Sequence, residues 1–318
     1  MALKKFLMAG IVAVVLVACG DDDSGDFATR PSGDSSSACE DCDGSSSSKA
    51  KSSSSSSVTP QSSDSETSVS SSSSAKSSSS SVKSSSSVAY VEPCRTDSVD
   101  TCEYGTLTDE RDGQTYKTVT IGTQIWMAEN LNYAYTGVPY KYTYKDSSYT
   151  SDSTSWCYGD SLANCTKYGR LYTWAAAMDS VGSWSTNGKG CGYGQTGSPT
   201  YPVRGICPEG WHLPDTTEWH TLFTAVGGKS TAGKMLKSTS GWNSSGNGTD
   251  AYAFSALPAG DRGSSGFFYY EGYGADFWSS TEDGSDYAYY MYLLYNNDNA
   301  FLNSTYKNYG FSVRCLKD

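Results

Sequence analysis

A serine-rich segment limits which part of this chain can fold. Residues Ser45 to Ser87 contain 28 serines among 43 residues. Serine brings almost no apolar surface, so burial does not offset the about 1 to 2 kcal/mol of backbone entropy that each ordered residue loses. All 25 tyrosines lie at or beyond Tyr90, and all 8 tryptophans lie at or beyond Trp126. The sequence therefore predicts a disordered serine-rich tether over residues 19–90 and a single folded domain over residues 91–318.

The N-terminus predicts export and attachment to a membrane through lipid. Two lysines precede a 12-residue apolar run, Phe6 to Val17, which is shorter than the about 20 residues of a membrane-spanning helix. The run leads into the box Leu-Val-Ala-Cys, which resembles a bacterial lipoprotein signal. We therefore expect a signal peptide over residues 1–18 and diacylglycerol on Cys19, which anchors the chain to the membrane.

Charge near the anchor and over the whole chain bears on location and partners. Asp21 to Asp23 resemble the export tags of surface-exposed lipoproteins in some Gram-negative bacteria, and a solvated acidic spacer explains them equally well. We expect an outer-membrane lipoprotein whose domain faces the cell exterior.

The net charge of −11 excludes nucleic-acid binding through a basic face, because phosphate contacts need clustered Lys and Arg.

The ten cysteines fit an oxidising compartment. With Cys19 lipidated nine remain, so at least one has no partner within the chain. The candidate disulfides are Cys94 with Cys102 and Cys157 with Cys165, which close small loops, and Cys207 with Cys315, which closes a long one.

Local patterns predict two helices and several short strands. Apolar residues at i, i+3, i+4 and i+7 favour a helix over Tyr168–Asp179. A second helix follows Asp215, which has the spacing of a capping box with Glu218, and it ends at a pair of glycines. A turn signal and β-rich residues predict a hairpin or a pair of short strands over residues 111–127. Short strands are expected at residues 277–279, 287–295 and 311–315.

Eight segments carry a resemblance to a known family. They are similar, in order, to motifs of the Fibrobacter succinogenes major paralogous domain family: residues 112–116, 121–131, 156–159, 168–174, 207–214, 257–260, 277–280 and 311–315. That family resembles, more distantly, the C-type-lectin-like fold shared with the formylglycine-generating enzymes. The resemblance implies an α+β, C-type-lectin-like domain with two short helices, short antiparallel strands and long disulfide-stapled loops.

The resemblance also bears on the cysteines. A bridge from Cys207 to Cys315 matches the long disulfide of the lectin-like proteins. Relatives tend to carry a second cysteine shortly after the one that matches Cys191, whereas this chain has Gly197. Cys191 is therefore the predicted unpaired thiol.

Aromatic residues among polar neighbours favour a non-catalytic binding module with glycan as the ligand class. Flat rings stack on the C–H faces of sugars, although aromatic rings also dominate protein cores. A polysaccharide is the favoured partner. The alternative is a structural or protein-interaction domain whose partner is an envelope protein. The candidate ligand-contact residues are Trp156, Trp184, Trp242, Tyr142 and Tyr144.

Cofactors and catalysis have less support. Calcium is a weak alternative to no cofactor, because it prefers oxygen ligands and lectin-like relatives place Asn and Asp near Asn297, Asp298 and Asn299. Such runs are more often turns.

An enzyme like the formylglycine generators needs a reactive cysteine pair late in the domain, where only Cys315 lies beyond Cys207. We therefore expect no enzyme and assign no catalytic residue.

Overall fold

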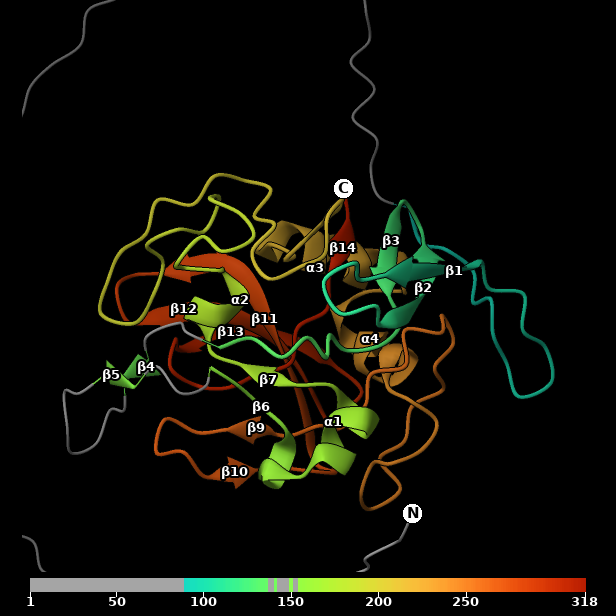
Figure 1. Ribbon diagram of the computed structural model, residues 1–318. Helices are drawn as coiled ribbons and strands as arrows, with labels where there is room; N and C mark the ends of the chain where they lie inside the picture. The colour runs from blue at the N-terminus through green and yellow to red at the C-terminus, as the bar shows by residue number, and fades with distance from the viewer. Residues whose placement is uncertain (1–88, 137–139, 142–148, 151–153) are drawn as a thin grey trace, which may run out of the picture. The chain divides into compact units, whose positions relative to one another are not determined.

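The computed structural model describes residues 89–136, 140–141, 149–150 and 154–318 (Figure 1). The chain divides into two units, residues 1–78 and 79–318, and all described residues belong to the second. The expected lipid site Cys19 and the ring candidates Tyr142 and Tyr144 lie outside the described residues. Within the described ranges, no helix has the length and apolar character needed to cross a bilayer.

The first sheet is antiparallel and has five strands, in the order β1-β2-β3-β14-β8. Gly113 and Gly122 have φ of 75° and 62° in the turns on either side of β2, a conformation that favours glycine. The hairpin expected over residues 111–127 is confirmed by the pairing of β2 with β3. The strands are β1 (Tyr104–Thr108), β2 (Thr115–Ile121), β3 (Gln124–Met127), β14 (Leu316–Lys317) and β8 (Trp211–His212).

The second sheet is an antiparallel meander of three longer strands, β11 (Gly274–Asp283), β12 (Tyr287–Leu294) and β13 (Ala300–Tyr306). The strand expected over residues 287–295 is confirmed as β12, whereas the strand expected at residues 277–279 is longer than predicted. β11 continues through Ser279 and Ser280, which are polar in the sequence but buried in the structure. The segment 311–315 forms isolated bridges to other strands and is not itself one of the named strands.

The helix expected over residues 168–179 is wrong. α1 (Leu162–Tyr168) ends where that helix was to begin, and Gly169 then turns the chain with φ of 75° and ψ of −164°. β7 (Leu171–Tyr172) follows, and α2 (Trp174–Ala177) is a single helical turn. The apolar residues of this segment are buried, as their spacing predicts, but they lie on a strand followed by a single helical turn and not on one helix.

The second expected helix is confirmed as α3 (Thr216–Ala225). Asp215 is its N-cap, and Asp215 and Glu218 form both hydrogen bonds of the capping box. A further helix, α4 (Lys229–Leu236), starts directly after the glycine pair and was not expected. The remaining elements are η1 (Tyr158–Asp160) and the strand pairs β4 (Tyr140–Lys141) with β5 (Tyr149–Thr150), β6 (Ser155–Trp156) with β7, and β9 (Asp261–Arg262) with β10 (Phe268–Tyr269).

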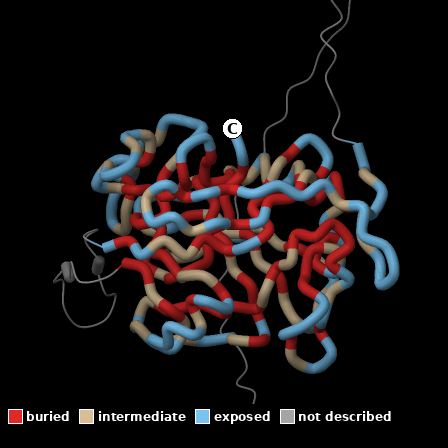
Figure 2. Tube along the Cα trace, turned by 45° about the vertical axis from the view of Figure 1, so that its right-hand side comes forward, coloured by how far each residue is buried: buried red, intermediate tan, exposed pale blue. Residues whose placement is uncertain are grey.

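Two hydrophobic clusters fill the interior, and Figure 2 draws the buried residues in red. Successive residues of a strand point to opposite faces, so Trp126 and Met127 enter different clusters, and so do Phe277 and Trp278. α3 contributes Trp219, whose ring centroid lies 4.7 Å from that of Trp126. A few short helices and several antiparallel sheets place the domain in the α+β class.

Three disulfides staple the domain. They join Cys94 to Cys102 and Cys157 to Cys165, each 8 residues apart, and Cys207 to Cys315, 108 residues apart. These are the three candidate pairs of the sequence analysis. Within the described part of the chain, Cys191 is free, and it is buried.

Candidate functional site

A cleft of about 710 Å³ lies between the first sheet and α1. Residues of β1 and β2 line one side, the segment after β3 lines another, and the end of α1 and residues 253–257 complete it. Ligand sites of proteins usually occupy about 300 to 1,000 Å³. The volume therefore suits a small ligand or a few sugar rings.

The floor of the cleft is fixed by Arg314, which is fully buried. Its Nε donates to Oδ1 of Asn130 at 2.8 Å, and its Nη2 donates to the carbonyl of Ser255 at 3.0 Å. Nη1 donates to the carbonyl of Phe254. Burial lowers the pKa of Arg314 to about 9, so the guanidinium stays charged at neutral pH. A buried cation held by this many acceptors leaves little freedom to the segments that it joins.

Asn130 and Gly169 bring two of those segments together at the floor. The amide of Asn130 donates to the carbonyl of Tyr168 at 2.8 Å. Gly169 has φ of 75°, and a Cβ there would lie 2.8 Å from both Cβ of Asn130 and the carbonyl oxygen of Leu131. Glycine is therefore required here both by its backbone conformation and by the lack of space.

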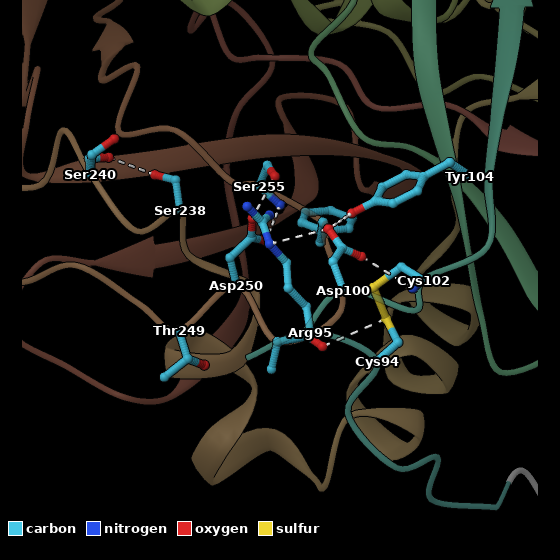
Figure 3. A network of polar contacts seen from close by, with 12 residues as sticks. Cys94, Arg95, Asp100, Cys102, Tyr104, Ser238, Ser240, Thr249, Asp250 and Ser255 are labelled. Carbon is cyan, nitrogen blue, oxygen red and sulfur yellow. Dashed lines mark hydrogen bonds and ion pairs between the residues drawn. A yellow bond between two sulfur atoms is a disulfide. The ribbon is translucent and has the colours of Figure 1, made fainter. Parts of the chain in front are cut away.

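One wall is a network of charged groups, shown in Figure 3. Arg95 Nη1 lies 2.7 Å from Oδ2 of Asp250, and its Nε lies 3.6 Å from Oδ2 of Asp100. The hydroxyl of Tyr104 donates to Asp100 at 2.8 Å. This hydrogen bond lowers the pKa of Asp100, while burial and the same bond raise the pKa of Tyr104 to about 12. At neutral pH the wall thus presents a phenol bound to a charged carboxylate, and Tyr104 is 49% exposed.

The rest of the rim offers donors and acceptors of several kinds. The exposed Glu129 accepts from the backbone N–H of Lys117 at 2.6 Å. The amide of Asn132 donates to Oε1 of Gln114 at 3.0 Å. Lys167, at the end of α1, adds a side chain that is 55% exposed. Such a rim suits a ligand rich in hydroxyl groups, since each hydroxyl both donates and accepts.

The tryptophans named from the sequence lie elsewhere. The guanidinium of Arg262 lies 3.9 Å from the ring centroid of Trp156. Trp184 is 37% exposed and packs edge-on against Tyr133. Trp242 is only 5% exposed, and its indole N–H donates to the hydroxyl of Ser238, so it is a core residue with no ring face for a ligand. None of the three tryptophans lines the cleft.

The turn with the calcium candidates already contains an internal cation. Nζ of Lys237 donates to the carbonyls of Leu294 at 3.0 Å and Asn297 at 3.1 Å. The side chain of Asn297 accepts from the backbone N–H of Asn299, as in an ordinary turn. Asp298 is exposed. Across the described ranges, no group of three or more His, Cys, Asp and Glu residues could hold a metal ion.

Sequence reasoning missed the cleft residues, although one signal was present. Five of the segments that resemble the family supply lining residues, from points far apart in the chain. No single segment shows this by itself, because only the fold brings them together. The lining residues from these segments are Gln114, Thr115, Tyr116, Ala128, Glu129, Asn130, Tyr168, Gly169, Leu257 and Arg314.

Comparison with protein families agrees with this pattern. The family model described as the Fibrobacter succinogenes major domain matches residues 119–317. The chain belongs to the Fibrobacter succinogenes major domain family. Neither the curated proteins nor the solved structures include a match.

The boundary of the family match divides the cleft. Asn130, Gly169 and Arg314 lie inside the matched residues, so the family domain supplies the floor. Arg95 and Tyr104 precede the match and belong to the wall shown in Figure 3. The rigid floor is thus built from the domain common to the family, whereas Arg95, Asp100 and Tyr104 of this wall come from the segment before it.

Proposed function

We propose that this protein is a lipid-anchored, non-catalytic module that binds glycan in the cleft and is displayed on the outer membrane. The rim of the cleft carries the proposal. It combines charged, amide and hydroxyl groups with the exposed ring of Tyr104 above a rigid floor. Sugars present hydroxyls and flat C–H faces, which these groups complement. A floor that does not rearrange also lowers the entropy lost on binding.

The anchor and the location follow from the N-terminal sequence. The lipoprotein-like box ending at Cys19 supports lipid attachment, and the acidic residues after it support display at the cell exterior. The serine-rich tether would hold the domain away from the membrane, because a flexible chain of about 70 residues spans roughly 45 Å. We further propose a C-type-lectin-like fold, supported by the α+β architecture and by the Cys207–Cys315 disulfide.

The state of the cysteines supports a binding role over an enzymatic one. Catalysis of the formylglycine-generating type uses reactive thiolates. Cys207 and Cys315 are joined in a disulfide, and burial raises the pKa of Cys191 to about 11. At neutral pH Cys191 is therefore a protonated, enclosed thiol, which favours a role in packing over a role as a catalytic nucleophile.

A glycan array tests the proposal. We expect the purified lipidated protein, in detergent, to bind a subset of glycans, and Tyr104→Ala to weaken that binding about tenfold by removing the ring. Tyr104→Phe keeps the ring and loses only the bond to Asp100, so its loss should be smaller. Tyr287→Ala serves as the control, because Tyr287 is 38% exposed and lies outside the cleft.

Two results would redirect the proposal. If no glycan is bound, but an envelope protein is captured in a manner that depends on Tyr104, the alternative of a protein-interaction domain gains support. If Tyr104→Ala and Tyr287→Ala both leave glycan binding unchanged, the cleft is not the site. Cleavage of the tether by protease added to intact cells tests display at the surface.

A further inference from the structure

Asp261, on β9, is a buried carboxyl without a counter-charge. The residue is 6% exposed, and its Oδ1 is enclosed without a hydrogen-bond partner. Among the residues that the structure describes, the Asp261 carboxyl takes part in no hydrogen bond or ion pair. Burial alone raises its pKa to about 7. An uncompensated carboxyl in such a place costs stability, which points to a partner outside the chain.

Asp276, on β11, lies beside it. The two strands meet through a parallel bridge between Gly260 and Ala275, and the next residue on each strand is an aspartate. Because side chains alternate, both aspartates point to the face opposite to Ala275. Adjacent strands are about 4.8 Å apart, so the two carboxyls are neighbours. Burial, and then the charge of Asp261, raises the pKa of Asp276.

Tyrosine rings border the pair. Tyr292 on β12 lies opposite Asp276 in the sheet, and Tyr269 on β10 lies opposite Asp261. Tyr269 and its neighbour Tyr270 are 43% and 65% exposed. Asp276, taken as a whole residue, is half-buried. The ring of Tyr292 is stacked against Tyr290 and Phe301, so the exposed rings beside the two carboxyls are those of Tyr269 and Tyr270.

The adjacent cation faces away from the pair. Arg262 follows Asp261 on β9 and points to the other face, where its guanidinium lies over Trp156, 3.9 Å from the ring centroid. A carboxylate beside aromatic rings attracts an organic ammonium group through Coulomb and cation–π attraction, and the ammonium group in turn favours the ionised form of the carboxyl. Calcium fits less well, because it takes six to eight oxygen ligands and rings supply none.

We propose that Asp261 and Asp276 form a binding site for an amino sugar, with the two carboxyls holding its ammonium group. The exposed rings of Tyr269 and Tyr270 supply flat faces for the sugar ring, which is why an amino sugar fits better than an amine side chain. None of these residues lines the cleft, so the site is separate and does not rest on the function proposed there.

Calorimetry on the full lipidated protein in detergent tests this site with glucosamine as the probe. We expect N-acetylglucosamine and glucose to bind at least about tenfold more weakly, because neither carries the charge. Asp261→Asn and Asp276→Asn should weaken glucosamine binding by a similar factor. Asp283→Asn, at the exposed end of β11, is the matched control and should change nothing. Tyr104→Ala should also leave glucosamine binding intact, which separates this site from the cleft.

Other outcomes would overturn the assignment. Equal affinity for glucose would show that charge plays no part, and equal affinity for lysine methyl ester would show that the sugar ring plays none. Saturable calcium binding that displaces glucosamine would make the pair a metal site.

The melting temperature without ligand gives an independent test. We expect Asp261→Asn to raise it, since an isolated buried carboxyl is removed, and a clear fall would mean that the carboxyl serves the fold instead.

Discussion

Gly197 lies directly against the thiol of Cys191. A Cβ at position 197 would overlap Sγ of Cys191 and lie 3.3 Å from its Cβ, just below the about 3.5 to 4.5 Å that disulfides span. Gly197→Cys should therefore form a disulfide with Cys191 under oxidising conditions. Closing this short loop should raise the free energy of unfolding by about 2 kcal/mol. Urea denaturation with and without reductant measures the difference.

Gly197→Ser is the matched control for that prediction. Serine has nearly the size of cysteine but forms no bridge, so it should crowd the buried thiol and lower stability. The backbone N–H of Gly197 donates to both oxygens of Glu282 at 3.0 Å, a contact that both variants keep. A cysteine variant that stays as unstable when oxidised as the serine variant would contradict the prediction.

The long disulfide should matter more than the short ones. In the chain-entropy model, the bridge between Cys207 and Cys315, 108 residues apart, contributes about 5 kcal/mol. The bridge between Cys157 and Cys165, 8 residues apart, contributes about 2.5 kcal/mol. Replacing each pair by alanines and comparing thermal unfolding measures the two effects. Equal losses of stability would mean that native-state strain, rather than loop length, dominates.

Lys307 should be essential to the turn between β11 and β12. Its side chain is fully buried, and Nζ pairs with Glu282 and donates to the carbonyls of Gln195, Gly284 and Ser285 at 2.8 to 2.9 Å. Lys307→Met leaves the largely buried carboxylate of Glu282 without its cationic partner, which should cost about 3 to 5 kcal/mol in urea denaturation.

Adding Glu282→Gln to that variant should recover part of the loss, because the unpaired charge is gone. Lys167→Met is the surface control: Lys167 lies 4.0 Å from Glu271 and is 55% exposed, so it should change stability by less than about 0.5 kcal/mol. A double variant less stable than Lys307→Met alone would argue against the charge-pair explanation.

Local signals in the sequence predicted the elements that local interactions determine. Asp215 and Glu218 cap α3 through bonds between neighbours in the chain, so their spacing alone identified the helix. The helix over residues 168–179 failed because Leu171 and Trp174 are buried at helical spacing without lying on one helix. The sequence does not announce α4, because its N-cap is Gly228, a residue type that equally marks the end of a preceding helix.

The sites depend on contacts that no local pattern records. Arg314 reaches Asn130 across 184 residues and Ser255 across 59, so the cleft exists only after the chain has folded. Asp261 and Asp276 become neighbours only because the residues before them, Gly260 and Ala275, form a bridge between separate parts of the chain. By contrast, Trp242 has polar neighbours in the sequence, yet its ring is buried in the core. Burying a large ring stabilises the folded state more than leaving it exposed to solvent.

His212 should make stability depend on pH. Its Nε2 lies 2.8 Å from Oε1 of Glu218 and its Nδ1 lies 2.7 Å from Oδ1 of Asp318. Burial opposes the charge, but the two carboxylates outweigh it and raise the pKa of His212. The stability gained is complete below the unfolded pKa of about 6.5 and is lost as pH rises through the folded pKa. His212→Gln should therefore destabilise the protein more at pH 5.5 than at pH 9, as measured by urea denaturation. His220→Gln, at the exposed His220, should have little effect at either pH, and an equal effect of His212→Gln at both would contradict the assigned ion pairs.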